Sequence, residues 1–131
     1  MRPGLDELDK RILEELMKDS SVSLRQLARR LNVPVTTLHE RVKRLRKLGA
    51  VRRFTIDLDY EVLGYTVTLI IQIRVDGTKI HSVEAVLSRH PNVIALYDVT
   101  GEYDLVVIAK FRDMKEADSF IKSLLTVDGI R

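Results

Sequence analysis

The sequence has no cysteine and no tryptophan, and aromatic residues make up only 5% of its 131 residues. The missing cysteine excludes disulfide frameworks, thiolate zinc sites, iron–sulfur clusters and thiol nucleophiles. No apolar run approaches the roughly 18 residues that a membrane span needs. The polar, acidic segment from Met1 to Asp9 lacks the features of a secretory signal. These absences predict a cytoplasmic protein that has no membrane partner.

Charge is abundant, at 31% of the residues, and it is unevenly distributed. Residues 1–60 hold 14 Lys or Arg against 9 Asp or Glu, whereas residues 61–131 hold 8 against 10. All seven aromatic residues come from Phe54 onward. This division indicates two modules with different partners. We expect a first module over residues 1–53, an extended linker over 54–64, and a second module over 65–131.

The first module has the pattern of three helices. Apolar residues at helical spacing predict a first helix that begins after Asp6 and buries residues as far as Met17. Ser23 and Gln26 form a capping-box pattern for a second helix, and Asn32 can end it in the left-handed conformation. Pro34 can then occupy the first position of a third helix that runs to about Leu48. Two helices joined by so tight a turn indicate a helix-turn-helix domain.

The third helix has a polar face opposite its buried face, and a basic segment follows it. Lys and Thr side chains on such a face can reach bases and phosphates in the major groove of double-stranded DNA. A basic face can also be simple solvated surface, but the tight turn and the preceding helix favour DNA. The candidate DNA-binding residues are Thr36, Thr37, His39, Glu40, Lys43, Arg44, Lys47, Arg52 and Arg53.

The second module alternates with a period of two from Tyr65, which predicts a strand. A helix follows over residues 79–89 with Ile80, Val83, Val86 and Leu87 inward, and then strands over 93–99 and 105–111. A last helix after Asp113 should bury Ala117, Phe120, Ile121, Leu124 and Leu125. The order βαββα predicts an α+β, ferredoxin-like domain βαββα(β) that lacks or truncates its last strand.

One face of this sheet should pack the two helices, and the other face also carries apolar residues. Those residues are Ile70, Ile94, Leu96, Val106 and Ile108. An exposed apolar sheet face needs a cover, which predicts a homodimer formed through this module.

The sequence holds no catalytic constellation, so we expect neither an enzyme nor a cofactor, and no catalytic residue is assigned. No metal site is expected either, because the spacing of His39, His81 and His90 does not group them. The carboxylates of Asp98, Glu102 and Asp104 cluster at the turn between the last two strands. These carboxylates can be explained by the turn alone, in which Asp side chains accept from backbone amides. The alternative is that they recognise an amine-bearing ligand.

The whole chain resembles the Lrp/AsnC, or feast/famine, family of transcription regulators of bacteria and archaea. The resemblance rests on LDELDKRILEELMKDSSVSLRQLARRLNV, TTLHERVKRLRKLGAVRRFT, YEVLGY and VTGEYDLVV, in this order and at these spacings. It implies that residues 1–53 form a winged-helix-like DNA-binding domain and that residues 65–131 form a ligand-sensing and dimerisation domain. The resemblance further implies an archaeal, nucleoid-associated member that forms dimers, and often octamers. It also implies an amino acid or similar small effector near Gly101, Tyr103 and Asp104, which alters oligomerisation and thereby DNA binding.

Two other functions remain open at this point. Siroheme decarboxylase subunits are similar to this family and share both of its domains, and such an enzyme would bind a tetrapyrrole. An architectural protein that compacts DNA with little sequence preference would use the same basic residues. The sequence does not separate that protein from a sequence-specific regulator.

Overall fold

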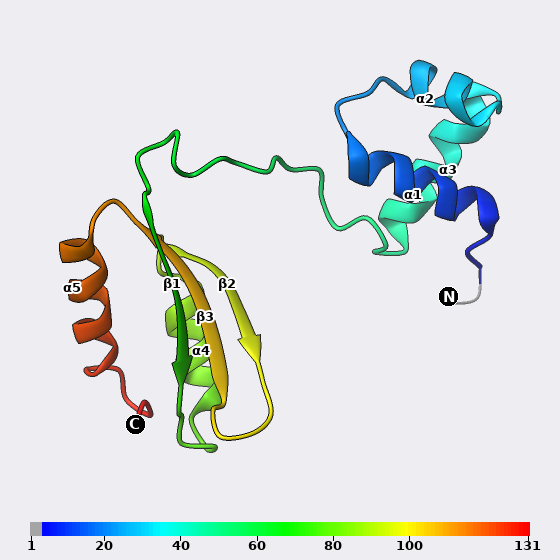
Figure 1. Cartoon of the computed structure of the whole chain (residues 1–131). Coiled ribbons are helices and arrows are strands. Elements are labelled where there is room, and N and C mark those ends of the chain that lie inside the picture. Colours follow the sequence, from blue (N-terminus) through cyan, green and yellow to red (C-terminus); the bar gives the residue numbers. More distant parts are fainter. Residues whose placement is uncertain (1–3) are drawn as a thin grey trace. The chain divides into compact units, whose positions relative to one another are not determined.

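The computed structural model describes residues 4–131, which divide into two compact units, the first ending at Asp57 and the second beginning at Leu58. The first unit contains the helices α1 (Glu7–Lys18), α2 (Leu24–Leu31) and α3 (Val35–Lys47). The second contains, in order, β1 (Val67–Ile73), α4 (Ile80–Ser88), β2 (Val93–Asp98), β3 (Leu105–Phe111) and α5 (Met114–Leu124) (Figure 1). The expected α+β class and the order βαββα are both confirmed.

Several helix ends in the first unit form as their residues predict, but the capping box expected at Ser23 and Gln26 forms only in its Ser23 half. Asp6 caps α1 by accepting from the Asp9 amide, and the Asp9 side chain accepts from the Asp6 amide in return. Ser23 accepts from the amide of Gln26 at the start of α2, and Asn32 ends that helix with φ 54° and ψ 50°. Pro34, expected at the first position of the third helix, precedes that position by one residue. It is the N-cap of α3, which begins at Val35, so the first turn of α3 has no side-chain cap.

The core of the first unit is formed by all three helices. Ile12 of α1, Leu27 of α2, and Leu38 and Leu45 of α3 are completely buried. Met17, expected on the buried face of α1, is instead 86% exposed. It is one residue beyond Leu16, the last residue of α1 that packs against this core.

The second unit is a three-stranded antiparallel sheet in the order β1–β3–β2. Ile71 pairs with Val107, and Val107 pairs in turn with Leu96, so these three side chains share one face. Helices α4 and α5 cover that face. The residues near the end of the described chain continue the sheet only by a single antiparallel bridge between Val75 and Ile130.

Four expected positions in the second unit are wrong. Leu96 packs in the helix-covered core and not on the open face. The register shifts between Val93 and Ala95, and such a bulge reverses the side-chain alternation of β2. Val86 of α4 is 51% exposed, and Ile121 and Leu125 at α5 are 39% and 74% exposed. In α4 and α5, the buried face is therefore narrower than the face that carries apolar residues.

Candidate functional site

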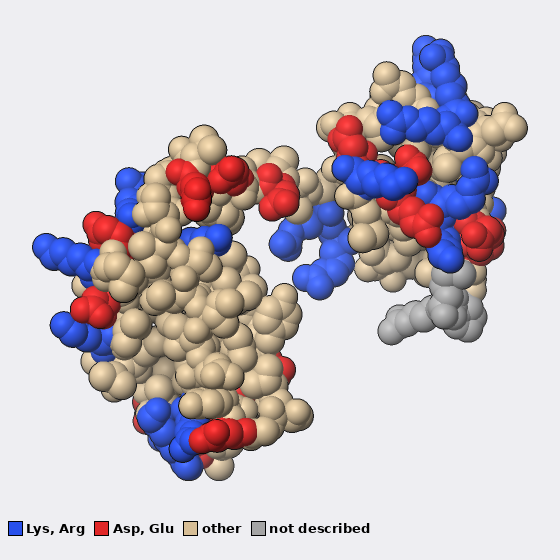
Figure 2. Space-filling model, viewed as in Figure 1, with Lys and Arg blue, Asp and Glu red and all other residues tan. Residues whose placement is uncertain are grey.

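The exposed face of α3 carries most of the residues proposed for DNA contact. Leu38, Val42 and Leu45 turn the opposite face into the core. The exposed positions of the candidate set are Thr36, His39, Glu40, Lys43 and Lys47 on the helix, followed by Arg52 and Arg53. Thr37 is half-buried beside this face. Figure 2 shows Lys and Arg side chains spread over the visible surface of this unit.

Arg44 differs from the other candidates because the fold already engages it. Its Nη1 lies 3.2 Å from Oδ2 of Asp9, a carboxylate that is completely buried, and its Nη2 donates to the carbonyl of Gly4. Arg41 joins the same cluster, with Nη1 3.2 Å from Oδ1 of Asp9 and 2.6 Å from Oδ1 of Asp6. The guanidinium of Arg44 thus ties α3 to the start of α1, and its contact with DNA stays a prediction.

This cluster also shifts the titration of its outer carboxylate. The hydrogen bond from Arg41, with further help from the amide of Asp9, lowers the pKa of Asp6 from 3.8 to about 2. The hydrogen bonds that Arg41 donates to the carboxylates of Asp6 and Asp9 raise the pKa of Arg41. Both groups are therefore charged at neutral pH. Their attraction holds the first turn of α1 against the middle of α3.

A second basic group lies outside the candidate set. Arg25 and Arg29 of α2 line a shallow hollow of about 460 Å³ that is also bordered by Pro34 and Val35, at the start of α3. The two arginines are four residues apart, so one face of the helix presents both. The i, i+4 spacing is a signal in the sequence that could have identified this pair. The longer basic run from Arg41 to Arg53, most of which lies in α3, is the stronger signal in the sequence.

The turn between β2 and β3 is anchored to the end of β1. The Asp104 carboxylate accepts from the Val75 amide at 2.7 Å, and the Asp104 amide donates to the carbonyl of Ile73 at 2.9 Å. Gly101 has φ +108°, a conformation that favours glycine. Both residues therefore stabilise the turn itself: Asp104 satisfies a backbone donor, and Gly101 adopts the positive φ that the turn requires.

Three carboxylates that are near in sequence have three different partners here. Glu102 pairs with Arg74, whose guanidinium also lies 5.3 Å from the ring centre of Tyr103. Asp98 contacts α4, where its hydrogen bond with Glu84, followed by burial, raises the pKa of Glu84 above its ordinary value. Of these three carboxylates, only that of Glu102 meets a guanidinium at the exposed surface of the turn.

The three histidines are separate in the structure. His39 is exposed on α3 of the first unit, and His81 on α4 lies 3.6 Å from Glu84. His90 packs edge-on against Phe120, with 4.8 Å between the ring centres. Within residues 4–131, no three His, Asp or Glu side chains group as metal ligands would. No helix among these residues is both long enough and apolar enough to cross a membrane.

Comparison with known proteins assigns each unit to a family. Residues 5–52 match the family model of the winged helix-turn-helix DNA-binding domain, and residues 68–131 match that of the Lrp/AsnC ligand binding domain. A so far uncharacterised HTH-type transcriptional regulator of Pyrococcus furiosus is 47% identical over 126 residues. That alignment covers 96% of this chain and 85% of the relative.

Solved structures show the same arrangement of elements. LrpC of Bacillus subtilis is 26% identical with a TM-score of 0.88, over all of this chain and 91% of LrpC. A transcriptional regulator of Neisseria meningitidis, solved as its complex with L-Met, is 25% identical with a TM-score of 0.91. It covers 97% of this chain, and the match extends over 84% of that regulator. With both domains matched in order and a relative aligned over nearly the whole chain, this protein belongs to the Lrp/AsnC family of transcriptional regulators.

Proposed function

We propose that this regulator binds specific sites in double-stranded DNA through the exposed face of α3 and the basic residues after it. One observation carries the proposal: Lys43 and Lys47 are exposed on the side of α3 opposite Leu38, Val42 and Leu45. A helix held in this way can place its polar face in a major groove. Arg52 and Arg53 then reach the flanking phosphates, and residues 54–64 act as the linker to the sensing domain.

Selection from a random duplex library tests this proposal. The expected product is a pseudo-palindromic site, because a symmetric dimer reads two half-sites. Affinity for that site should fall by about 10³ or more between 50 and 200 mM salt if six to ten phosphates are contacted. Binding without any enriched sequence would favour an architectural DNA-compacting protein, and no binding at any salt concentration would refute the proposal.

We further propose that the exposed turn with Gly101, Tyr103 and Asp104 contributes to an amino-acid effector site. Arg74 and Glu102 pair with each other, and an amino acid would replace this pair, with its carboxylate at Arg74 and its ammonium at Glu102. The second carboxylate oxygen of Asp104 would also accept from the ammonium, since only Oδ2 accepts from the Val75 amide. The L-Met complex of the Neisseria meningitidis regulator supports an amino acid as the ligand class.

A thermal-shift screen of the free amino acids tests the effector site. A ligand present at 100 times its dissociation constant should add about 2.7 kcal/mol of stability. Asp104→Asn should abolish the shift, because the amide oxygen still accepts from the Val75 amide while the negative charge is lost. Asp118→Asn, on an exposed position of α5, is the matched control. The assignment fails if Asp104→Asn responds as the control does.

We also propose that two copies pair through the open face of the sheet. Ile70 in the middle of the edge strand β1 is 69% exposed, and Tyr97 of β2 is 58% exposed. Ile70 pairs with Ile108, which pairs in turn with Ala95, so an apolar row crosses all three strands. Figure 2 shows the middle of this face free of charged side chains. Such a surface is typical of an interface between subunits.

A further inference from the structure

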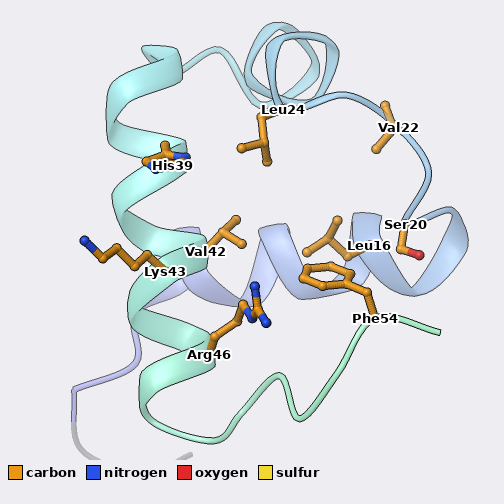
Figure 3. A pocket seen from close by; sticks show the side chains of 9 residues that line it. All are labelled: Leu16, Ser20, Val22, Leu24, His39, Val42, Lys43, Arg46 and Phe54. Carbon is orange, nitrogen blue, oxygen red and sulfur yellow. The ribbon is translucent and has the colours of Figure 1, made fainter.

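An open cavity of about 590 Å³ lies at the surface of the first unit, beside the proposed DNA-contacting helix α3 (Figure 3). Its volume is within the range of roughly 300–1,000 Å³ that is typical of small-molecule sites. All its lining residues belong to the first unit, from α1, the α1–α2 connection, α2, α3 and Phe54. The cavity is therefore separate from the effector turn, which lies in the other unit.

The lining is apolar on one side and cationic at its rim. Leu16, Val22, Leu24 and Val42 form the apolar wall. Phe54 adds an aromatic ring, and Figure 3 shows the Arg46 side chain extending toward this ring. The Arg46 guanidinium carbon lies 5.5 Å from the ring centre. This cation–π contact places a positive charge beside the apolar wall.

Lys43 and His39 complete the rim, and no lining residue is acidic. The carboxylates next to lining residues in the sequence belong to Glu15, Asp19 and Glu40. Glu15 lies near Lys18 and Arg30, and Asp19 accepts from the amide and hydroxyl of Ser21. Among the described residues, no ion pair joins any of the three to Lys43 or Arg46. A ligand in this cavity therefore meets uncompensated positive charge next to hydrocarbon. This combination suits a carboxylate on a branched or aromatic body. An amino acid fits less well, because its ammonium would face Lys43 and Arg46 without an acidic partner.

We propose that this cavity binds an apolar carboxylate without an amino group, such as an aromatic or branched 2-oxo acid, and that binding competes with DNA. The competition rests on the proposed function, since His39 and Lys43 belong both to the cavity rim and to the exposed face of α3. A carboxylate at Lys43 neutralises a charge that the phosphates would otherwise use.

Methyl NMR and calorimetry of the full chain without DNA test the cavity directly. In the NMR spectra, phenylpyruvate should shift the methyl signals of Leu16, Val22 and Leu24. In calorimetry, phenylpyruvate should bind at least tenfold more tightly than L-phenylalanine, which adds an ammonium, and than 3-phenylpropanamide, which is neutral. Arg46→Gln should weaken phenylpyruvate about tenfold, the expected loss for one hydrogen bond to a charged group. Arg11→Gln, which removes an exposed charge from α1 outside the cavity, should change nothing.

Three results would overturn the site: unchanged methyl signals, equal binding of the acid and the amide, or equal binding by Arg46→Gln. Methyl signals that respond to protein dilution and not to phenylpyruvate would assign the cavity to a second copy of the chain, which also overturns it.

Competition is measured by fluorescence anisotropy on the selected duplex. Saturating phenylpyruvate should raise the apparent Kd for DNA at least fivefold, and an unchanged Kd overturns the competition. A chain that binds no DNA at all refutes the proposed function instead. The DNA-free titration still decides whether the cavity binds its ligand, so the two failures are distinguishable.

Discussion

At the residue scale, Asp9 explains how α3 is held in place. It is the only charged side chain among residues 4–131 that is completely buried, and it contacts both Arg41 and Arg44. A buried carboxylate needs such partners, because an unpaired buried charge is strongly destabilising. Two of the seven basic residues between Arg41 and Arg53 therefore serve the fold. The number of basic residues in this segment overestimates the charge that is available to DNA.

Asp6 should make stability depend on acid pH. Its pKa is lowered from 3.8 to about 2, so its contribution is present above pH 3.8 and is lost as pH falls toward 2. Asp6→Asn keeps a capping oxygen and removes the charge. In urea denaturation at pH 5, the midpoint of the wild type should lie at a higher urea concentration than that of this variant. The two midpoints should converge as the pH falls to about 2. A constant difference across this range would contradict the linkage.

Lys43 and Lys47 should contribute to DNA affinity through phosphates. Lys43→Ala combined with Lys47→Ala should weaken binding of the selected duplex and reduce the salt slope by about two, roughly one for each phosphate that is no longer neutralised. Anisotropy titrations at several salt concentrations measure both effects. Lys10→Ala combined with Arg11→Ala on α1 is the control and should leave the slope within experimental error. An unchanged slope in the Lys43 and Lys47 variant would remove these residues from the interface.

At the element scale, local signals define the helix ends well and the buried faces less well. Caps depend on a few neighbouring residues, and Asp6, Ser23 and Asn32 act as their types predict. Burial depends on which element lies opposite, so Met17, Val86 and Leu125 are exposed despite apolar periodicity. The bulge in β2 also changes which side chains are buried. It reverses the side-chain alternation so that Leu96 packs in the core, and no local residue pattern indicates this reversal.

The turn between α2 and α3 should tolerate glycine better than alanine. Asn32 has φ 54°, where a residue with an ordinary side chain is strained. Asn32→Ala should lower the free energy of unfolding by about 1 kcal/mol or more, and Asn32→Gly should lower it less. Chemical denaturation of both variants gives the comparison. If alanine is tolerated as well as glycine, the left-handed conformation is not what Asn32 supplies.

At the scale of the whole molecule, assembly follows from what each unit leaves uncovered. Each unit is small, and units of this size have little core of their own. The second unit uses one sheet face for α4 and α5 and leaves Ile70, Ile108 and Tyr97 on the other. Pairing of two such faces would add a second core layer, so assembly and stability should change together.

Ile70→Lys should therefore dissociate the dimer without unfolding the chain. The side chain is 69% exposed in the single chain, so a lysine there is solvated when the face is open and costly when it is covered. Sedimentation equilibrium should show a dimer for the wild type and a 15.0 kDa species for the variant. Val86→Lys, on an exposed position of α4, is the matched control and should remain dimeric. A dimeric Ile70→Lys variant would place the interface elsewhere.

By itself, the sequence determined the two modules, their element order, the helix caps and the exposed polar face of α3. These features depend on composition, periodicity and short-range hydrogen bonds, all of which are local. Only the tertiary structure decided that Arg44 belongs to Asp9, that Leu96 lies in the core, and that Arg46 and Phe54 border a cavity. Each of these depends on a contact between segments far apart in the chain, or on a register shift, and no local pattern encodes such geometry.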